Sequence, residues 1–253
     1  MTTVKPILNI SAYLFVSLTD TAALRESIRS QAGARQLKGT VLLAEEGINL
    51  FLAGLANDVH AFVDWLQTDA RFKPLTPKES HTTSVPFKKL MVKVKPEIIR
   101  MNHPTINPAA QRAPAVDAKT LARWLRTGTD DAGQSVVMLD TRNAFEVDHG
   151  RFNNAVHWKL SKFSDFPEAA VLHAAELQGK TVVSYCTGGI RCEKAAIFMA
   201  QAGLKNVLQL DGGILKYFEE AGSEHFEGTC FVFDEREALN GNLAAVGSRE
   251  TAL

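Results

Sequence analysis

Residues 181–202 read Thr-Val-Val-Ser-Tyr-Cys-Thr-Gly-Gly-Ile-Arg-Cys-Glu-Lys-Ala-Ala-Ile-Phe-Met-Ala-Gln-Ala, and this stretch decides the fold of the chain around it. The apolar run at 181–185 is rich in β-branched and aromatic residues, which predicts a buried strand. Two glycines follow Cys186 within three residues, and apolar residues then recur at helical spacing over 192–202. We therefore expect a strand, a glycine-bearing loop and a helix, with Cys186 where the strand ends.

The predicted loop favours the ionised form of the Cys186 thiol. A helix N-terminus presents unpaired backbone N–H groups and a partial positive charge. Glycines let the loop turn successive N–H groups inward, and Arg191 adds a full positive charge at the end of the same turn. All three effects lower the pKa of a thiol, so we expect Cys186 to be a nucleophile. A buried structural cysteine is the alternative, but the surrounding motif favours the nucleophile.

The motif around Cys186 resembles a known family. Residues 115–221 resemble a rhodanese domain, in which a cysteine precedes five loop residues that end in arginine or a similar residue. Here this active-site loop consists of Cys186, Thr187, Gly188, Gly189, Ile190 and Arg191. The longer string at 186–195, Cys-Thr-Gly-Gly-Ile-Arg-Cys-Glu-Lys-Ala, is similar to the rhodanese-like proteins that hydroxylate the wobble uridine of tRNA with molecular oxygen. This similarity extends over nearly the whole chain.

Further candidate residues lie next to this loop. Residues 140–146 follow a predicted buried strand and match an Asp-x-Arg motif with a following Glu that recurs in rhodanese domains. Asp140 and Arg142 suit a pair that braces the rim of the active site, and a purely structural salt bridge is the alternative. Cys192 either resolves an oxidised or persulfidated Cys186 or packs in the first helical turn. The sequence leaves both alternatives open.

The order of predicted elements divides the chain into domains. Before residue 95 the order is β-α-β-β-α-β, with strands at 7–17, 39–44, 48–53 and 84–94, which is typical of a ferredoxin-like α+β sandwich. Later strands alternate with helices, which predicts an α/β domain with a parallel sheet covered on both faces. We expect a ferredoxin-like domain at 1–95, a proline-rich basic linker at 96–114, a rhodanese domain at 115–225 and a C-terminal extension at 226–253 that is disordered from residue 240.

Composition excludes several classes of protein. The 253 residues are 45% hydrophobic and 22% charged, and 28 basic residues balance 28 acidic ones, as in ordinary globular proteins. Three cysteines without a secretory segment predict a reducing cytoplasmic environment, and no apolar run approaches the roughly 20 residues of a membrane span. The cysteines also lack the spacing of a zinc site, so we expect no metal.

Two groups of residues are candidates for substrate binding. Residues 45–49 read Glu-Glu-Gly-Ile-Asn, and the residues alone favour a solvated turn with a positive φ at the glycine over paired catalytic carboxylates. The resemblance implies that Gly47 and Asn49 lie near the substrate groove. Residues 85–126 hold nine basic and two acidic residues, which suits either phosphate binding or protection of a sheet edge. The resemblance favours contacts with the tRNA backbone by Lys88, Lys89, Lys93, Lys95 and Arg100.

The resemblance implies an enzyme that forms 5-hydroxyuridine at position 34 in the anticodon loop of tRNA. Molecular oxygen would be the co-substrate, and we expect no cofactor, no membrane association and no obligate protein partner. Addition of the Cys186 thiolate to C6 of uracil would make C5 electron-rich and able to take oxygen. The alternative is a sulfurtransferase that carries a persulfide on Cys186. A binding module without activity is disfavoured because the cysteine loop is intact.

Overall fold

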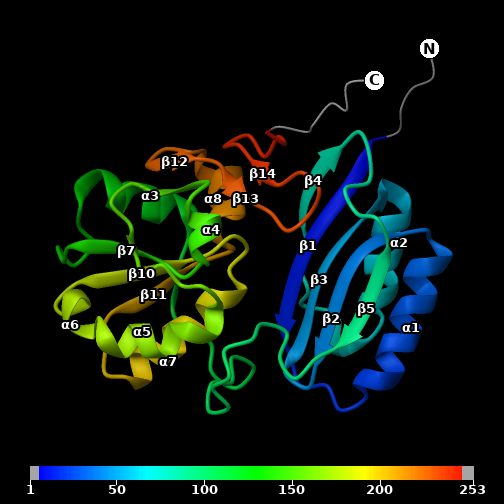
Figure 1. Ribbon diagram of the computed structural model, residues 1–253, viewed down its shortest axis with the longest axis horizontal. Helices are drawn as coiled ribbons and strands as arrows, with labels where there is room; N and C mark the ends of the chain where they lie inside the picture. Colours follow the sequence, from blue (N-terminus) through cyan, green and yellow to red (C-terminus); the bar gives the residue numbers. More distant parts are fainter. Residues whose placement is uncertain (1–5, 247–253) are drawn as a thin grey trace. The chain divides into compact units, whose positions relative to one another are not determined.

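The computed structural model describes residues 6–246 and divides the chain into two compact units, with the division after Ile99 (Figure 1). Within residues 6–246, no helix combines the length and the hydropathy that a bilayer crossing requires. In the same part of the chain, no group of three His, Cys, Asp or Glu side chains converges as metal ligands would.

The first unit is a five-stranded sheet in the order β4-β1-β3-β2-β5. Two helices pack on one face of it (Figure 1). The order and the antiparallel pairing of β1 with both β3 and β4 confirm the predicted ferredoxin-like sandwich. Its elements are β1 (Ile7–Phe15), α1 (Thr21–Ala34), β2 (Lys38–Ala44), β3 (Gly47–Leu55), α2 (Ala56–Gln67), the 3₁₀ turn η1 (Ala70–Phe72), β4 (Lys78–Thr82) and β5 (Leu90–Val94).

The predicted strand at 84–94 is confirmed only over β5 (Leu90–Val94), and its place as the fourth strand of the sandwich is wrong, because that strand is β4 at Lys78–Thr82. The buried Asn9 of β1 holds β4 in place, since its Nδ2 donates to the Ser80 carbonyl at 3.2 Å and to the Thr82 hydroxyl at 3.0 Å. Only Leu90–Val94 of the predicted stretch is extended, and this β5 pairs in parallel with β2 at the opposite edge. The basic segment therefore forms an edge strand.

The second unit contains the predicted parallel sheet, in the order β6-β11-β10-β7-β9. Helices α3 and α8 lie on one face, and α5, α6 and α7 lie on the other (Figure 1). The elements in chain order are β6 (Ala115–Val116), α3 (Ala118–Thr127), β7 (Val136–Asp140), α4 (Ala144–Val147), β8 (Gly150–Phe152), β9 (Val156–His157), η2 (Phe163–Asp165), α5 (Phe166–Leu172), α6 (Ala174–Leu177), β10 (Thr181–Tyr185), α7 (Ile190–Gln201), β11 (Val207–Leu210) and α8 (Gly213–Ala221).

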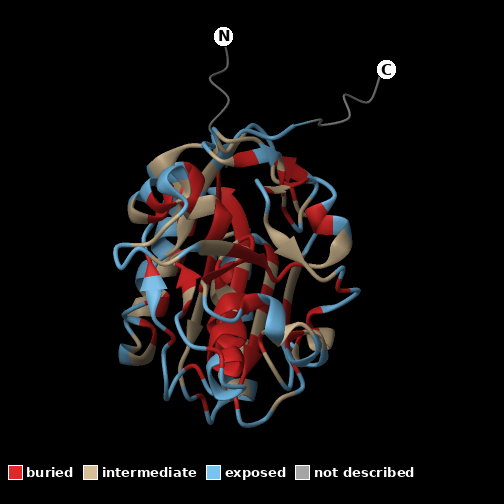
Figure 2. Ribbon diagram, turned by 90° about the vertical axis from the view of Figure 1, so that its left-hand side faces the viewer, coloured by how far each residue is buried: buried red, intermediate tan, exposed pale blue. Residues whose placement is uncertain are grey.

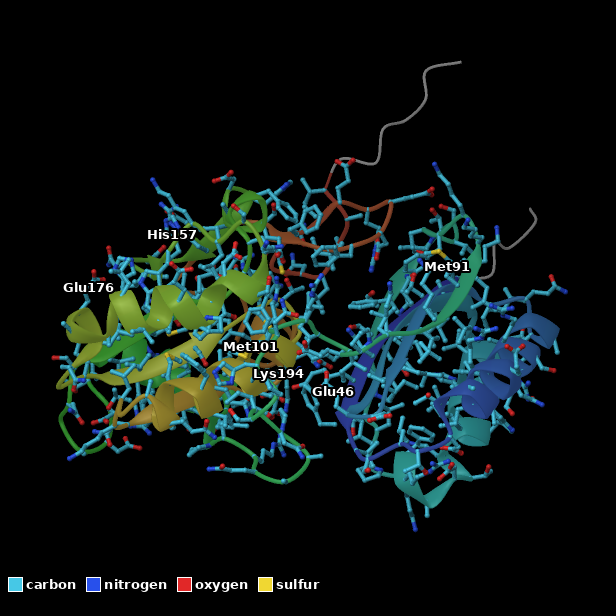
Figure 3. The ribbon with its side chains drawn as sticks, turned by 60° about the horizontal axis from the view of Figure 1, so that its bottom comes forward. Glu46, Met91, Met101, His157, Glu176 and Lys194 are labelled. Atoms are coloured by element: carbon cyan, nitrogen blue, oxygen red, sulfur yellow. The ribbon has the colours of Figure 1, made fainter. Side chains whose placement is uncertain are left out.

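The centre of this unit is formed by β10 and α7, whose residues are among the buried ones that Figure 2 colours red. Every residue of β10 is buried, and α7 is buried from Arg191 to Met199. Polar side chains of α7 are buried as well. Lys194, which extends from α7 in Figure 3, is only 2% exposed. A helix buried on nearly all sides belongs to the interior of a domain, so the cysteine loop between β10 and α7 starts from rigid elements.

The C-terminal extension packs on the second unit through two short ribbons. Strand β12 (Phe226–Gly228) pairs with β8, and β13 (Cys230–Phe231) pairs with β14 (Ala238–Leu239). Residues 240–246, which the sequence analysis expects to be disordered, form hydrogen-bonded turns that include the 3.0 Å bond from Val246 N–H to the Ala238 carbonyl. The remainder of that predicted end lies outside the described residues.

Candidate active site

Cys186 directly follows β10 at the carboxyl edge of the parallel sheet, where open α/β sheets bind ligands. Helix α7 begins at Ile190, after Gly189 as its N-cap residue. Gly189 has a φ of +101°, in the left-handed region that favours glycine. This conformation turns the Gly189 N–H back toward the cysteine, at 3.1 Å from Cys186 Sγ. The predicted strand, loop and helix are therefore present in that order.

The surroundings of Cys186 stabilise the thiolate. Burial raises the pKa of its thiol, but four other effects outweigh burial and lower that pKa to about 5. The first is a hydrogen bond from the Cys192 thiol, the second is the charge of Arg191, and the others are the backbone N–H groups of Arg191 and Gly189. A pKa near 5 leaves Cys186 ionised at neutral pH, which is the state that a nucleophile requires.

A buried carboxylate fixes the guanidinium beside the thiolate. Glu146 accepts two hydrogen bonds from Arg191, one from Nη1 at 2.6 Å and one from Nη2 at 2.7 Å. The Asn143 N–H donates to the same carboxylate at 3.1 Å, and the Thr187 hydroxyl donates to it at 3.4 Å. Bidentate pairing orients a guanidinium more strictly than a single bond does. Glu146 therefore connects α4 to the cysteine loop.

Glu146 is not among the site residues predicted from the sequence, although the motif at 140–146 contains it. A local signal was available, because Asn143 and Glu146 have the spacing of a capping box. The structure shows one half of that capping box at the start of α4, the bond from the Asn143 N–H to the Glu146 carboxylate at 3.1 Å. The sequence did not indicate that the same carboxylate also receives Arg191, which lies 45 residues further along the chain.

Cys192 lies in the first turn of α7 and is fully buried. Burial raises its pKa, and the neighbouring Cys186 thiolate raises it further. Its sulfur also lies 3.7 Å from the Thr141 hydroxyl. The proton therefore stays on Cys192, and its thiol donates to Cys186. Both earlier interpretations of Cys192, as a resolving thiol and as a packing residue, remain compatible with this position.

Asp140 and Arg142 form a fully buried salt bridge behind the loop. Arg142 Nη2 lies 2.6 Å from Asp140 Oδ2 and also donates to the Gly150 carbonyl at 2.6 Å. The Arg142 guanidinium lies 5.8 Å from the centre of the ring of Tyr185, which is the residue before Cys186. The pair joins the ends of β7, β8 and β10, which fits both the bracing role and the purely structural salt bridge, so both stay predictions.

The N-terminus of α8 supports the cysteine loop on its backbone side. The Ile214 N–H donates to the Cys186 carbonyl at 3.0 Å, and the Leu215 N–H donates to the Thr187 carbonyl at 3.1 Å. Gly213 permits this approach, because a Cβ at that position would lie 2.4 Å from the Cys186 carbonyl oxygen. The loop therefore has its conformation fixed by two helices.

The side chain of Cys186 has no exposed surface. The predicted addition of Cys186 to uracil requires a sulfur that a base can contact, whereas the structure covers the sulfur. The sulfur is therefore not accessible to a base in this structure.

Comparison with known proteins identifies two families along the chain. The family described as "UPF0176 acylphosphatase like domain" matches residues 7–98, and the rhodanese-like domain family matches residues 118–220. A Bordetella pertussis protein named tRNA uridine(34) hydroxylase is 61% identical over 238 residues, which cover 94% of this chain and 98% of that protein. A Delftia acidovorans protein of the same name is also 61% identical, covering 94% of this chain and 90% of that protein. The chain belongs to the tRNA uridine(34) hydroxylase family.

Membership of this family confirms the resemblance inferred from residues 186–195. Among solved structures, a rhodanese-like domain from an Anabaena species matches with 19% identity and a TM-score of 0.38. The match covers 55% of this chain and 90% of the Anabaena chain.

The residues predicted near a substrate groove in the first unit have structural roles. Gly47, at a φ of +148°, leaves no room for a side chain, because a Cβ would lie 2.1 Å from the Leu14 carbonyl oxygen. Asn49 is buried and donates to the Ile98 carbonyl at 3.3 Å. Glu46, labelled in Figure 3, accepts the Ile98 N–H at 2.7 Å. The positive φ at Gly47 confirms the predicted turn, whereas contact of Gly47 and Asn49 with substrate stays a prediction.

The predicted phosphate-binding residues are all exposed. Four lysines lie on or beside the edge strand β5, which also carries Met91 in Figure 3: they are Lys88, Lys89, Lys93 and Lys95. Arg100 donates through Nε to Asn102 Oδ1 at 2.9 Å. Their exposure fits phosphate binding, and their position at a sheet edge also fits protection against strand pairing. Both alternatives from the sequence analysis therefore stay open.

Proposed function

We propose that the chain hydroxylates C5 of uridine 34 in tRNA and that Cys186 is the nucleophile. The observation that supports this most strongly is the ionised thiol, held by Gly189 and Arg191 in a chain 61% identical to proteins named for this reaction. The proposal includes the binding of the anticodon loop of tRNA as a single-stranded element, whose unpaired bases are free to enter a protein site.

The proposed chemistry begins with a bond between Cys186 Sγ and C6 of uracil. The electron pair of the C5–C6 double bond moves to C5, which takes molecular oxygen and a proton to give a C5 hydroperoxide. A thiol reductant supplies two electrons and two protons, so that the O–O bond breaks into a C5 hydroxyl group and water. Loss of the C5 proton and of the Cys186 thiolate restores the double bond. Neither a metal nor an organic cofactor is part of this proposal.

The residues around Cys186 suit this sequence of steps. Arg191 and the loop N–H groups keep the sulfur anionic before it adds and receive it again as a thiolate leaving group. Cys192 retains its proton beside the reacting sulfur and is a thiol of the class that the reduction needs. Because the sulfur is buried, binding of the RNA must be coupled to opening of the site.

The test is a reaction of the purified chain with unmodified tRNA, a thiol reductant and ¹⁸O₂, followed by mass spectrometry of the nucleosides. We expect 5-hydroxyuridine with one ¹⁸O atom. Cys186→Ser should lower the rate by about 10³-fold or more, as for loss of other enzyme nucleophiles. Cys230→Ala, which removes another buried thiol, is the matched control and should retain the rate within a few-fold. Full activity of Cys186→Ser would end the proposal.

The sulfurtransferase alternative has its own assay. A persulfide enzyme would convert thiosulfate and cyanide to thiocyanate with the same cysteine, and it would leave the uridine unchanged. Thiocyanate formation without 5-hydroxyuridine would establish that alternative in place of the hydroxylase.

A further inference from the structure

An exposed aromatic cluster lies beside the cysteine loop. The rings of Phe145, Phe231 and Phe233 meet edge to face, with centroids 5.2 Å apart for Phe145 and Phe231 and 5.1 Å apart for Phe231 and Phe233. The His149 ring lies 5.2 Å from Phe231. Phe145 is 46% exposed and Phe233 is 51% exposed, which is unusual for side chains of this size. We call these four residues the aromatic platform.

The aromatic platform is continuous with the residues that hold the nucleophile. Phe145 immediately precedes Glu146, which binds Arg191. The Phe231 carbonyl accepts the Thr187 hydroxyl at 3.5 Å, directly after the catalytic cysteine. Strand β13 and helix α4, which carry these two phenylalanines, pack against each other (Figure 1). A group that rests on the platform is therefore close to the active-site loop.

We propose that the aromatic platform stacks unpaired bases that flank uridine 34 in the anticodon loop. This inference rests on the proposed function and adds the surface that holds the neighbouring bases. Aromatic side chains bind unstacked bases without regard to their identity, because every base has a π face. Edge-to-face contacts hold the rings in defined orientations while parts of them stay exposed.

The charges near the platform favour bases over phosphates as its ligand. The exposed side chains of Asp148, Glu235 and Glu237 lie on the segments that carry the rings. Carboxylates repel the phosphate backbone but do not prevent stacking. The platform should therefore contribute to affinity with little dependence on salt, in contrast to lysines that contact phosphates.

The test measures binding of a fluorescent RNA hairpin, an anticodon stem-loop with uridine at position 34, to the full-length chain. We expect Phe145→Ala and Phe233→Ala each to weaken binding about 5- to 150-fold, the range for loss of one stacked base. The slope of log Kd against log salt concentration should not change. Phe233→Trp should keep the affinity, since it retains a ring. The matched control is Leu172→Ala, because Leu172 of α5 is 76% exposed and should have no effect.

A hairpin with abasic sites on either side of uridine 34 separates stacking from other losses. This hairpin should bind the wild-type chain more weakly than the intact hairpin does. The affinities of the two alanine variants for the two hairpins should differ much less, because these variants already lack the stacking contact that the abasic sites remove. Circular dichroism checks that the variants fold. Wild-type affinity of both alanine variants would overturn the inference, and so would full affinity of Phe233→Leu, which keeps the apolar surface without the ring.

Self-association is the remaining outcome to measure, by sedimentation of the wild-type chain. A dimer that both alanine variants abolish would show that the platform joins two copies of this chain, and the inference would fail. The proposed function is tested apart from this. If the wild-type chain forms no 5-hydroxyuridine, that function fails, whereas normal product formation with unchanged hairpin binding by the variants removes only the platform.

Discussion

Cys186 and Cys230 are both fully buried thiols of the second unit, yet their pKa values are shifted in opposite directions. Burial raises the pKa of Cys230 to about 12, and its sulfur donates to the Phe231 carbonyl at 3.7 Å. Cys186 instead accepts the Gly189 N–H, and its pKa falls to about 5. Burial alone therefore favours a neutral cysteine, and the donors around the sulfur decide whether it becomes a nucleophile.

The comparison also shows why the two local sequences differ in function. Cys186 stands before a helix N-terminus, where unpaired N–H groups are available, whereas Cys230 lies within the short strand β13. An N–H group that already serves a sheet cannot also bind a sulfur. The same residue type thus gives an anionic thiolate in one place and an inert apolar side chain in the other.

The largest expected effect comes from Glu146, whose charge raises the pKa of Cys230 and whose carboxylate binds Arg191, the cation that lowers the pKa of Cys186. Glu146→Gln should lower the free energy of unfolding by about 3–5 kcal/mol, because Arg191 stays buried without its charged partner. It should also lower the pKa of Cys230, which the Glu146 charge helps to raise. Urea denaturation measures the stability. The control is Glu227→Gln, at an exposed pair with Arg151, which should cost less than about 1 kcal/mol. Equal costs would show that the buried pair is not important for the loop.

A smaller effect is expected from the support that α8 gives to the Cys186 loop. Gly213→Ala places a Cβ 2.4 Å from the Cys186 carbonyl oxygen and 2.8 Å from the Gly189 nitrogen. It should cost about 1–3 kcal/mol beyond the strain of a left-handed residue and should raise the pKa of Cys186, because the loop N–H group moves. Gly133→Ala is the matched control, with a similar φ of +78° and no neighbour within 4 Å. Thermal unfolding distinguishes the two, and identical losses would contradict the close contact.

The pH dependence of stability is the smallest expected effect per pH unit, and it should have opposite signs for the two cysteines. An unfolded cysteine has a pKa of about 8.5, so between pH 5 and 8.5 the unfolded state holds the proton that native Cys186 has lost. The stability of the wild-type chain relative to Cys186→Ala should therefore rise with pH in this window, by at most about 1.4 kcal/mol per pH unit.

Native Cys230 keeps its proton above pH 8.5, where an unfolded cysteine loses it. The stability of the wild-type chain relative to Cys230→Ala should therefore fall as the pH rises from 8.5 toward 12. Denaturation curves of the three proteins across both windows measure the two slopes. Parallel curves for wild type and Cys186→Ala below pH 8.5 would show that the native thiol is not shifted, and the contrast between the cysteines would disappear.

Short-range patterns predicted the central part of the second unit well. The strand at 181–185 has the predicted bounds. The helix after the cysteine begins two residues earlier than its apolar pattern indicates, at Ile190. Segments that are buried on every side have apolar runs of their own, so their type can be inferred without knowledge of their neighbours.

Long-range pairing explains what the sequence did not predict. Residues 78–82 have little apolar alternation, and they form a strand because Asn9 and the edge of β1 bind them. Similarly, Asp20 stands at the N-cap position of α1 but makes no side-chain cap bond there, and it binds Arg71 at 2.6 Å between Oδ1 and Nη1. Such partners lie 51 to 73 residues away in the chain. No local pattern specifies them, since a polar side chain can satisfy its hydrogen bonds in several ways.

The sequence by itself determined that Cys186 ends a strand and precedes a helix N-terminus with two glycines and an arginine, because these are properties of neighbouring residues. Long-range packing is what places Glu146 against that arginine, keeps the proton on Cys192 beside the thiolate and covers the sulfur. The pKa of a buried group depends on every charge and donor packed around it, and those are contributed by segments far apart in the chain.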